Sequence, residues 1–204
     1  AQGYPIILPS GTFVADARCA WLVEAVEADQ IRRQKPRHDP GWFHASDLGR
    51  SDEDLIATYR GEMRPPHSAQ LGRIFDTGLA RDKAWKQYCK DAGLVRNRRL
   101  RVRFKDLRLT GSCDVPVTNP NTGDPWIVEV KTINAFSWGQ LTEPKPEHLM
   151  QLTTYLVGLD VADGMVLYEN SDTRKLKLFA VTLEPALWDG IAARLRRLRA
   201  IAEM

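Results

Sequence analysis

The spacing of apolar residues changes once along this chain, and that change constrains the fold more than any other feature. From Leu71 to Ala92 apolar residues recur at alternating steps of four and three, as on one face of a helix that Gly93 ends. From Leu100 the spacing becomes two, with Val102 and Phe104 alternating with cationic residues. Helices therefore precede a run of strands. The sequence predicts a mixed α/β (α+β) fold, with a central mixed β-sheet flanked by helices.

The same reasoning places the remaining elements and the domain organisation. Helices are expected over 13–31, 46–60, 147–159 and 186–202, and strands over 107–117, 126–132, 165–168 and 175–182. Residues 34–44 are expected to form a loop. We expect one compact domain, in which a helical segment, 1–66, packs on a core of residues 67–204.

Composition limits the class of protein more than its function. A chain of 204 residues, 43% hydrophobic, can bury one proper core, and its net charge of +3 is too small to indicate nucleic acid by itself. The three cysteines lack metal-ligand spacing and one must stay unpaired, which favours a reducing cytoplasm. No apolar run approaches the roughly 20 residues of a membrane span, and no signal peptide is recognisable.

The segment WIVEVKT, residues 126–132, places charge on an otherwise apolar strand. Glu129 and Lys131 share one face, while Val128 and Val130 share the other. Charges on a buried strand are costly unless they have partners. A solvated strand face or a plain ion pair also fits this segment when it is taken alone.

Asp114 makes a functional interpretation more favourable. It lies on the preceding strand, and a hairpin closed by the turn-rich residues 119–125 would bring it beside Glu129, although the turn does not fix the register. Two converging carboxylates are best explained by a shared cation, and oxygen ligands favour Mg²⁺ or Mn²⁺. Such an ion can polarise a phosphodiester, with Lys131 orienting the attacking water or neutralising charge.

Asp82 interrupts the inward stripe of the long helix, which otherwise suits a core. If that stripe packs over the sheet, Asp82 can supply a third metal ligand or a water bridge to the ion. A buried aspartate paired with an arginine is the equally acceptable alternative.

Gln151 and Tyr155 share a helix face at positions i and i+4, with His148 one turn earlier. These side chains are candidates for holding a scissile phosphate or a base edge. A polar flank of an amphipathic helix is the alternative.

Basic residues gather beside the first strand and on the last helix. The strand patch is the stronger candidate for a DNA backbone track, against the alternative of a solvated face. It comprises Arg96, Arg98, Arg99, Arg101, Arg103 and Lys105. Trp138 is a candidate for stacking on unpaired bases.

Taken in order, these residues resemble the PD-(D/E)XK nuclease superfamily. The family pattern of an Asp, a Glu-X-Lys and a Gln-xxx-Tyr helix is matched by Asp114, by Glu129 to Lys131 and by Gln151 to Tyr155. Within the superfamily, the chain resembles phage exonucleases related to CRISPR adaptation exonucleases and to nuclease domains of recombination helicase–nucleases. Four segments between residues 45 and 183 carry that similarity: ASDLG (45–49), GRIFDTG (72–78), QLTTYLVGL (151–159) and LYEN (167–170).

The resemblance implies a restriction-endonuclease-like core and Mg²⁺- or Mn²⁺-dependent cleavage of DNA. It implies that Asp114, Glu129 and the backbone carbonyl of Val130 bind the metal and that Lys131 is catalytic. Gln151 and Tyr155 would help to bind and position the DNA. Asp82 stands where this branch commonly has a metal-binding His or Glu. Many relatives hold an iron–sulfur cluster with four cysteines, which this sequence lacks, so no cluster is expected.

The expected function is therefore that of a DNA exonuclease in phage recombination or replication, in the cytoplasm of a bacterial host. Phage or host recombination and replication proteins are candidate partners, and the sequence leaves the oligomeric state open. Two alternatives remain: an inactive nuclease fold that binds DNA or protein, and an endonuclease of the same superfamily.

Overall fold

The computed structural model describes residues 6–8, 13, 14, 17, 20–34, 39–62, 67–95 and 100–204. The chain divides into two compact units, one within Ala1–Arg37 and Met63–Leu79, the other within His38–Glu62 and Ala80–Met204. Residues 39–62 thus belong to the same unit as the sheets. The boundary expected at residue 66 stays a prediction.

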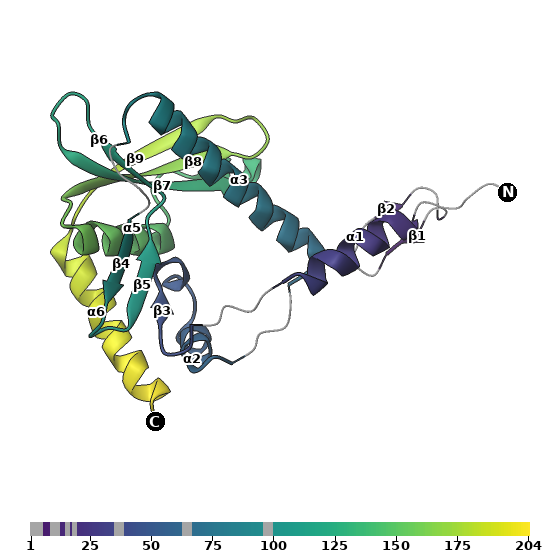
Figure 1. Ribbon diagram of the computed structural model, residues 1–204, viewed down its shortest axis with the longest axis horizontal. Coiled ribbons are helices and arrows are strands. Elements are labelled where there is room, and N and C mark those ends of the chain that lie inside the picture. Colours follow the sequence, from purple (N-terminus) through teal and green to yellow (C-terminus); the bar gives the residue numbers. More distant parts are fainter. Residues whose placement is uncertain are drawn as a thin grey trace. The chain divides into compact units, whose positions relative to one another are not determined.

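A four-stranded mixed sheet forms the centre of the larger unit (Figure 1). Its order is β6 (Val115–Thr118), β7 (Pro125–Ile133), β8 (Asp163–Asn170) and β9 (Leu176–Thr182). β7 pairs antiparallel with β6 and parallel with β8, and β8 pairs antiparallel with β9. The parallel crossover from β7 to β8 runs through α4 (Ala135–Gln140) and α5 (Pro146–Leu159). The predicted mixed sheet, with the WIVEVKT strand in its interior, is confirmed.

A second sheet has the order β3-β5-β4, formed by β3 (Phe43–His44), β5 (Leu109–Ser112) and β4 (Arg101–Phe104). The single strand expected over 107–117 is wrong: β5 ends in this sheet, and β6 begins in the other one after Cys113 and Asp114. The loop expected over 34–44 likewise missed β3. β3 and β6 are strands because each pairs with a neighbouring strand: Phe43 of β3 lies opposite Leu109, and Val115 of β6 lies opposite Val128.

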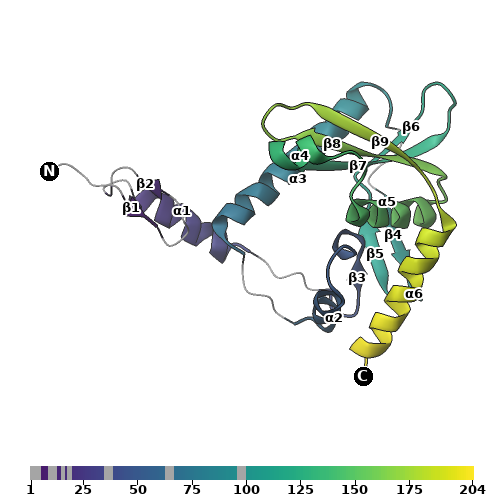
Figure 2. The same ribbon diagram turned by 180° about the vertical axis from the view of Figure 1, so that it is seen from behind.

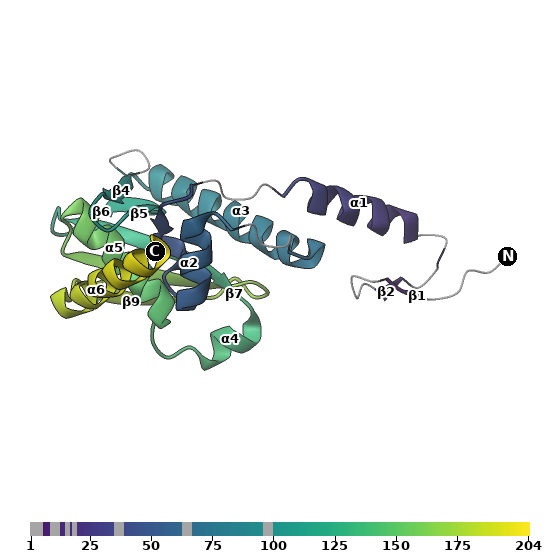
Figure 3. The same cartoon turned by 90° about the horizontal axis from the view of Figure 1, so that it is seen from below.

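Helix α5 contacts β7 and β8 of the larger sheet, β4 and β5 of the smaller one, and α6 (Pro185–Ala202) (Figure 2). For this reason it is buried around most of its circumference from Gln151 to Leu156. Helix α2 (Asp52–Arg60) lies beside α6, as Figure 3 shows. The side chain of Ser51 caps α2 by accepting a hydrogen bond from the backbone N–H of Asp54.

Helix α3 (Ala69–Asp91) confirms the long helix expected from the sequence, including its end before Gly93. Towards its C-terminus, Trp85 and Cys89 pack against Val128 and Val130, on one face of β7. The prediction that the apolar stripe of this helix is buried is wrong towards its N-terminus. There Leu71 and Phe75 are exposed, at 39% and 50%.

The smaller unit also holds the first elements of the chain. β1 (Ile6–Ile7) pairs antiparallel with β2 (Phe13–Val14), and α1 spans Ala20–Arg32. The helix expected from residue 13 therefore begins only at Ala20, because Phe13 and Val14 pair with a strand. Within the described part of the chain, no helix combines the length and apolar character needed to cross a bilayer.

Candidate active site

Strand β7 separates charged from apolar side chains by simple alternation. Val128 and Val130 face the cluster that includes Trp85, whereas Glu129 and Lys131 point to the opposite face, on the side of α5. Glu129 is completely buried, at 0% exposure. A pair of ionisable side chains therefore lies in the interior of the protein, which excludes the solvated strand face.

Asp114 lies in the bend between β5 and β6, beside this pair. The ladder pairs Val115 with Val128, so one further step places Asp114 across from Glu129. Asp114 Oδ2 accepts a hydrogen bond from the backbone N–H of Val130 at 3.2 Å. The structure thus brings together the two carboxylates whose register the sequence did not fix.

Glu129 is buried without the donors that a buried carboxylate normally has. Lys131 Nζ lies 2.7 Å from its Oε1 as an ion pair, but neither carboxylate oxygen accepts a well-directed hydrogen bond. Burial and, to a lesser extent, the charge of Asp114 raise the pKa of Glu129, Lys131 lowers it, and the net value is about 8. The site is thus short of positive charge at Glu129.

Lys131 joins the strand to α5. Its Nζ donates a hydrogen bond to Gln151 Oε1 at 3.0 Å, and Gln151 Nε2 donates to the hydroxyl of Tyr155 at 3.1 Å. Burial lowers the pKa of Lys131, but the charges of Glu129 and Asp114 outweigh it, so the pKa is raised. Burial also raises the pKa of Tyr155, which stays a neutral phenol. Gln151 and Tyr155 are therefore not on a polar flank but continue a buried polar chain.

His148 lies one turn earlier on α5 and contacts Tyr168. Its Nδ1 is 2.7 Å from the Tyr168 hydroxyl, which also accepts the backbone N–H of Lys145 at 2.9 Å. The Tyr168 proton is then free to donate to Nδ1, so the ring carries its own proton on Nε2. Burial, with the charges of Lys131 and Lys145, lowers the pKa of His148 to about 3, and the ring is neutral.

Asp82 is half-buried on α3, one turn before Trp85. Its charge contributes to the raised pKa of Lys131, which places it in the electrostatic neighbourhood of the site. Among the described residues, however, no three His, Cys, Asp or Glu side chains gather closely enough to hold a metal ion. Asp82 as a third ligand stays a prediction.

The basic residues expected to contact DNA separate into three groups. Arg101, Arg103 and Lys105 are exposed on or just after β4, whereas Arg96, Arg98 and Arg99 fall outside the described residues. On α6, Arg194 and Arg197 form ion pairs with Asp52 at 2.8 and 2.6 Å. Those two arginines therefore connect α6 to α2 through ion pairs within the fold.

Trp138 is not the exposed aromatic side chain that its position suggested. It is half-buried in α4, and Lys177 Nζ lies 4.3 Å from its ring centroid. Phe136, at 75% exposure, is the exposed aromatic residue of this helix. Sequence reasoning also missed Trp42, which lies just before β3 and stacks on Arg103 of β4, since no local pattern connects residues 61 positions apart.

Comparison with known proteins supports the fold. No family model matches the chain, and no curated protein sequence is similar to it. Among solved structures, it is similar to LHK-Exo, an alkaline exonuclease from Laribacter hongkongensis, with 15% identity, a TM-score of 0.58 and coverage of 88% of this chain and 92% of that one. The structure of LHK-Exo in complex with dAMP is similar at 16% identity, with a TM-score of 0.58 and coverage of 88% of this chain and 92% of that one.

A phage-related exonuclease from Haemophilus somnus 129PT is similar at 14% identity and a TM-score of 0.51, over 79% of this chain and 93% of that one. These likenesses, at low identity, establish a shared fold. The mixed sheets flanked by helices that the sequence predicts are thus the fold of known exonucleases.

Proposed function

We propose that this chain is a metal-dependent DNA nuclease, acting as an exonuclease that hydrolyses phosphodiester bonds. The observation that carries the proposal is Glu129, a carboxyl group with no exposure that lies beside a second carboxyl group, Asp114, and has Lys131 as its one ion-pair partner among the described residues. A buried, under-satisfied carboxylate beside a second one is costly unless a ligand compensates it. The exonuclease fold supplies the chemical context.

The donor set fits Mg²⁺ or Mn²⁺. Asp114, Glu129 and the backbone carbonyl of Val130 would hold the ion, with Asp82 binding directly or through water. All are oxygen ligands, which hard divalent cations prefer. When bound, the ion supplies polarisation of the phosphodiester and acidification of a water molecule. No iron–sulfur cluster is part of the proposal.

Lys131 is the proposed catalytic side chain. Its ammonium carries three protons, and the ion pair with Glu129 and the hydrogen bond to Gln151 direct two of them. The third proton is left for the attacking water or for a phosphate oxygen, where negative charge develops. Gln151 and Tyr155 hold this arrangement from α5, and we propose that they and His148 also contact the substrate.

DNA is the proposed substrate because a neighbour of the same fold is LHK-Exo in complex with dAMP. Arg101, Arg103 and Lys105, together with Arg99, would contact the backbone. The names of the similar structures favour an exonuclease over an endonuclease. A role in phage recombination or replication belongs to the same proposal.

The test is an assay on end-labelled linear DNA and on closed circular DNA, with Mg²⁺, Mn²⁺ or EDTA. We expect metal-dependent degradation of linear DNA, no cutting of circles, and loss of activity in Lys131→Ala. Cutting of circles would identify an endonuclease. DNA binding without cleavage under any metal would overturn the nuclease proposal in favour of a binding module on this fold.

A further inference from the structure

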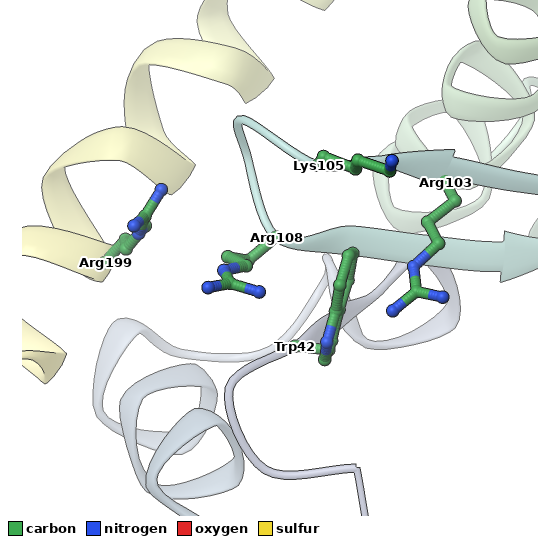
Figure 4. A pocket seen from close by; sticks show the side chains of 5 residues that line it. All are labelled: Trp42, Arg103, Lys105, Arg108 and Arg199. Carbon is green, nitrogen blue, oxygen red and sulfur yellow. The ribbon is translucent and has the colours of Figure 1, made fainter.

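A cationic pocket lies beside the turn between β4 and β5 of the smaller sheet (Figure 4). Its volume is about 410 Å³. It is lined by Trp42, Arg103, Lys105, Arg108 and Arg199. Four of the five lining residues are cationic and none is acidic.

Strand pairing assembles the pocket from three parts of the chain. The parallel pairing of β3 with β5, with Phe43 opposite Leu109, places Trp42 close to Arg108. The indole ring lies between two guanidinium groups, with Arg103 Cζ at 4.0 Å and Arg108 Cζ at 5.5 Å from the ring centroid. Cation–π contacts of this kind hold both arginines in place. Arg199 reaches the pocket from α6.

The positive charge of the pocket is only partly compensated, by Glu203, whose pKa is lowered by Arg199 and also by the charge of Arg108. Arg199 forms an ion pair with Glu203 at 2.8 Å and donates to the backbone carbonyl of Asp106 at 3.1 Å. Within the described part of the chain, Arg103, Lys105 and Arg108 form no ion pair. Like charges held together repel one another, and an anion removes that repulsion. Arginine held by an aromatic ring is well suited to phosphate.

We propose that this pocket binds one backbone phosphate of the DNA strand, away from the bond that is cut. The inference rests on the proposed function, because it takes DNA as the substrate. Arg108 and Asp114 are separated by six residues of extended chain, which span about 20 Å. Phosphates of a B-form strand follow one another at about 3.4 Å along the helix axis, so a duplex whose axis runs along this separation would place the pocket roughly six nucleotides from the active site. It would anchor the duplex while the active site acts on its end.

The test compares DNA binding by the wild type and by the double variant Lys105→Gln/Arg108→Gln, in EDTA so that no cleavage occurs. Among the described residues, neither the Lys105 nor the Arg108 side chain forms a hydrogen bond. Their replacement therefore removes no hydrogen bond from the folded protein. Lys90→Gln, at an exposed position on α3, controls for the loss of a positive charge outside the pocket. Binding to a duplex of about 20 base pairs is followed by fluorescence anisotropy between about 50 and 200 mM salt.

We expect the double variant to bind about ten-fold more weakly at low salt, with the slope of log K against log salt reduced by about one to two. Lys90→Gln should match the wild type. Equal affinities and slopes for the wild type and the double variant would overturn the proposal.

Placement of the contact is tested with duplexes that carry one uncharged methylphosphonate linkage at successive positions. The wild type should lose affinity when the linkage lies roughly six nucleotides from the scissile bond, and the double variant should not respond there. A uniform response at every position would overturn a discrete site. Cleavage by the wild type, measured in parallel, distinguishes failure of the pocket from failure of the nuclease proposal.

Discussion

Two buried glutamates on adjacent parallel strands have opposite surroundings. Glu169 on β8 is 4% exposed and accepts a hydrogen bond from Trp85 Nε1 at 2.7 Å, with Arg174 at 3.3 Å and Arg81 at 3.5 Å. Glu129 on β7 is 0% exposed, has Lys131 as its one ion-pair partner among the described residues, and accepts no well-directed hydrogen bond. They lie on opposite faces of the sheet, Glu169 towards α3 and Glu129 towards α5.

The difference shows how burial separates a structural carboxylate from a functional one. A carboxylate with two hydrogen-bond donors and a second arginine as ion-pair partner is compensated within the fold and contributes to stability. A buried carboxyl group without such partners has a desolvation cost that the fold does not compensate. Uncompensated groups of this kind are typical of functional sites, where a protein is less stable than it could be. The comparison predicts opposite consequences for the same substitution at the two positions.

Activity should separate the two glutamates most strongly. Glu129→Gln is expected to reduce the rate of DNA cleavage by at least about 10³-fold, because it removes charge from the proposed metal site. Glu169→Gln should stay within about ten-fold of the wild type, since it faces away from that site. Single-turnover cleavage of linear DNA measures both rates. Equal losses in the two variants would break the distinction.

Divalent cations should stabilise the protein through one glutamate only. At a concentration of about 100 times the Kd, Mn²⁺ or Mg²⁺ is expected to add about 2.7 kcal/mol to the free energy of unfolding of the wild type. Glu169→Gln should keep this increment and Glu129→Gln should lose it. Urea unfolding with metal or with EDTA gives the increments. An undiminished increment in Glu129→Gln would place the ion elsewhere.

In EDTA the stability of the two variants should change in opposite directions. The pKa of Glu129, about 8 in the folded protein, exceeds its ordinary value of 4.5. Its contribution to stability is therefore fully present below pH 4.5 and is lost as the pH rises through 8. Glu129→Gln should become progressively more stable than the wild type over that range. Glu169→Gln should be less stable by about 1–3 kcal/mol, because Arg81, Arg174 and Trp85 lose a charged acceptor.

Urea titrations at several pH values check this prediction. Tyr88→Phe, which changes an exposed side chain on α3, provides a substitution at neither carboxylate. If Glu129→Gln proved destabilising at every pH in EDTA, the carboxylate would be compensated in the folded state, and the contrast with Glu169 would not hold.

Much of the fold could be predicted because local periodicity and tertiary environment agree. β7, α3, α5 and α6 have clear hydrophobic spacing, and the structure confirms each of them. The break at Cys113 and Asp114 could not be read in this way. A strand that leaves one sheet and enters another keeps its alternation, and the positions of its partners decide where the pairing changes.

The candidate site was predictable where chemistry and pattern coincide. Glu129 and Lys131 disturb an apolar strand, and Asp114 precedes it at hairpin distance. Burial of Gln151 and Tyr155 was not predictable, because a polar pair at i and i+4 looks the same on an exposed flank and between two sheets. Glu169 was missed for a related reason: its partner Trp85 lies 84 positions away.

Tyr168 provides the mildest test, because it is a buried polar group on the same face of the sheet as Glu129 whose hydrogen bonds are complete. It is paired with Lys131 across the ladder, accepts the N–H of Lys145, and donates to His148. Tyr168→Phe should cost about 1 kcal/mol of stability at neutral pH, the usual net value of such bonds, and should not become stabilising at any pH above 6.5.

The pH dependence of His148 sharpens this last expectation. Its folded pKa, about 3, lies below the ordinary 6.5, so the stability contributed by its neutral form is present above pH 6.5 and is lost as the pH falls towards 3. The cost of Tyr168→Phe, which removes the donor to that neutral ring, should therefore stay about constant from pH 7 to 4, because the folded ring remains neutral over that range. Urea unfolding of both proteins from about pH 7 to 4 measures it. A cost that grew as the pH fell would mean that Tyr168 supports a protonated His148, contrary to the hydrogen bonds described here.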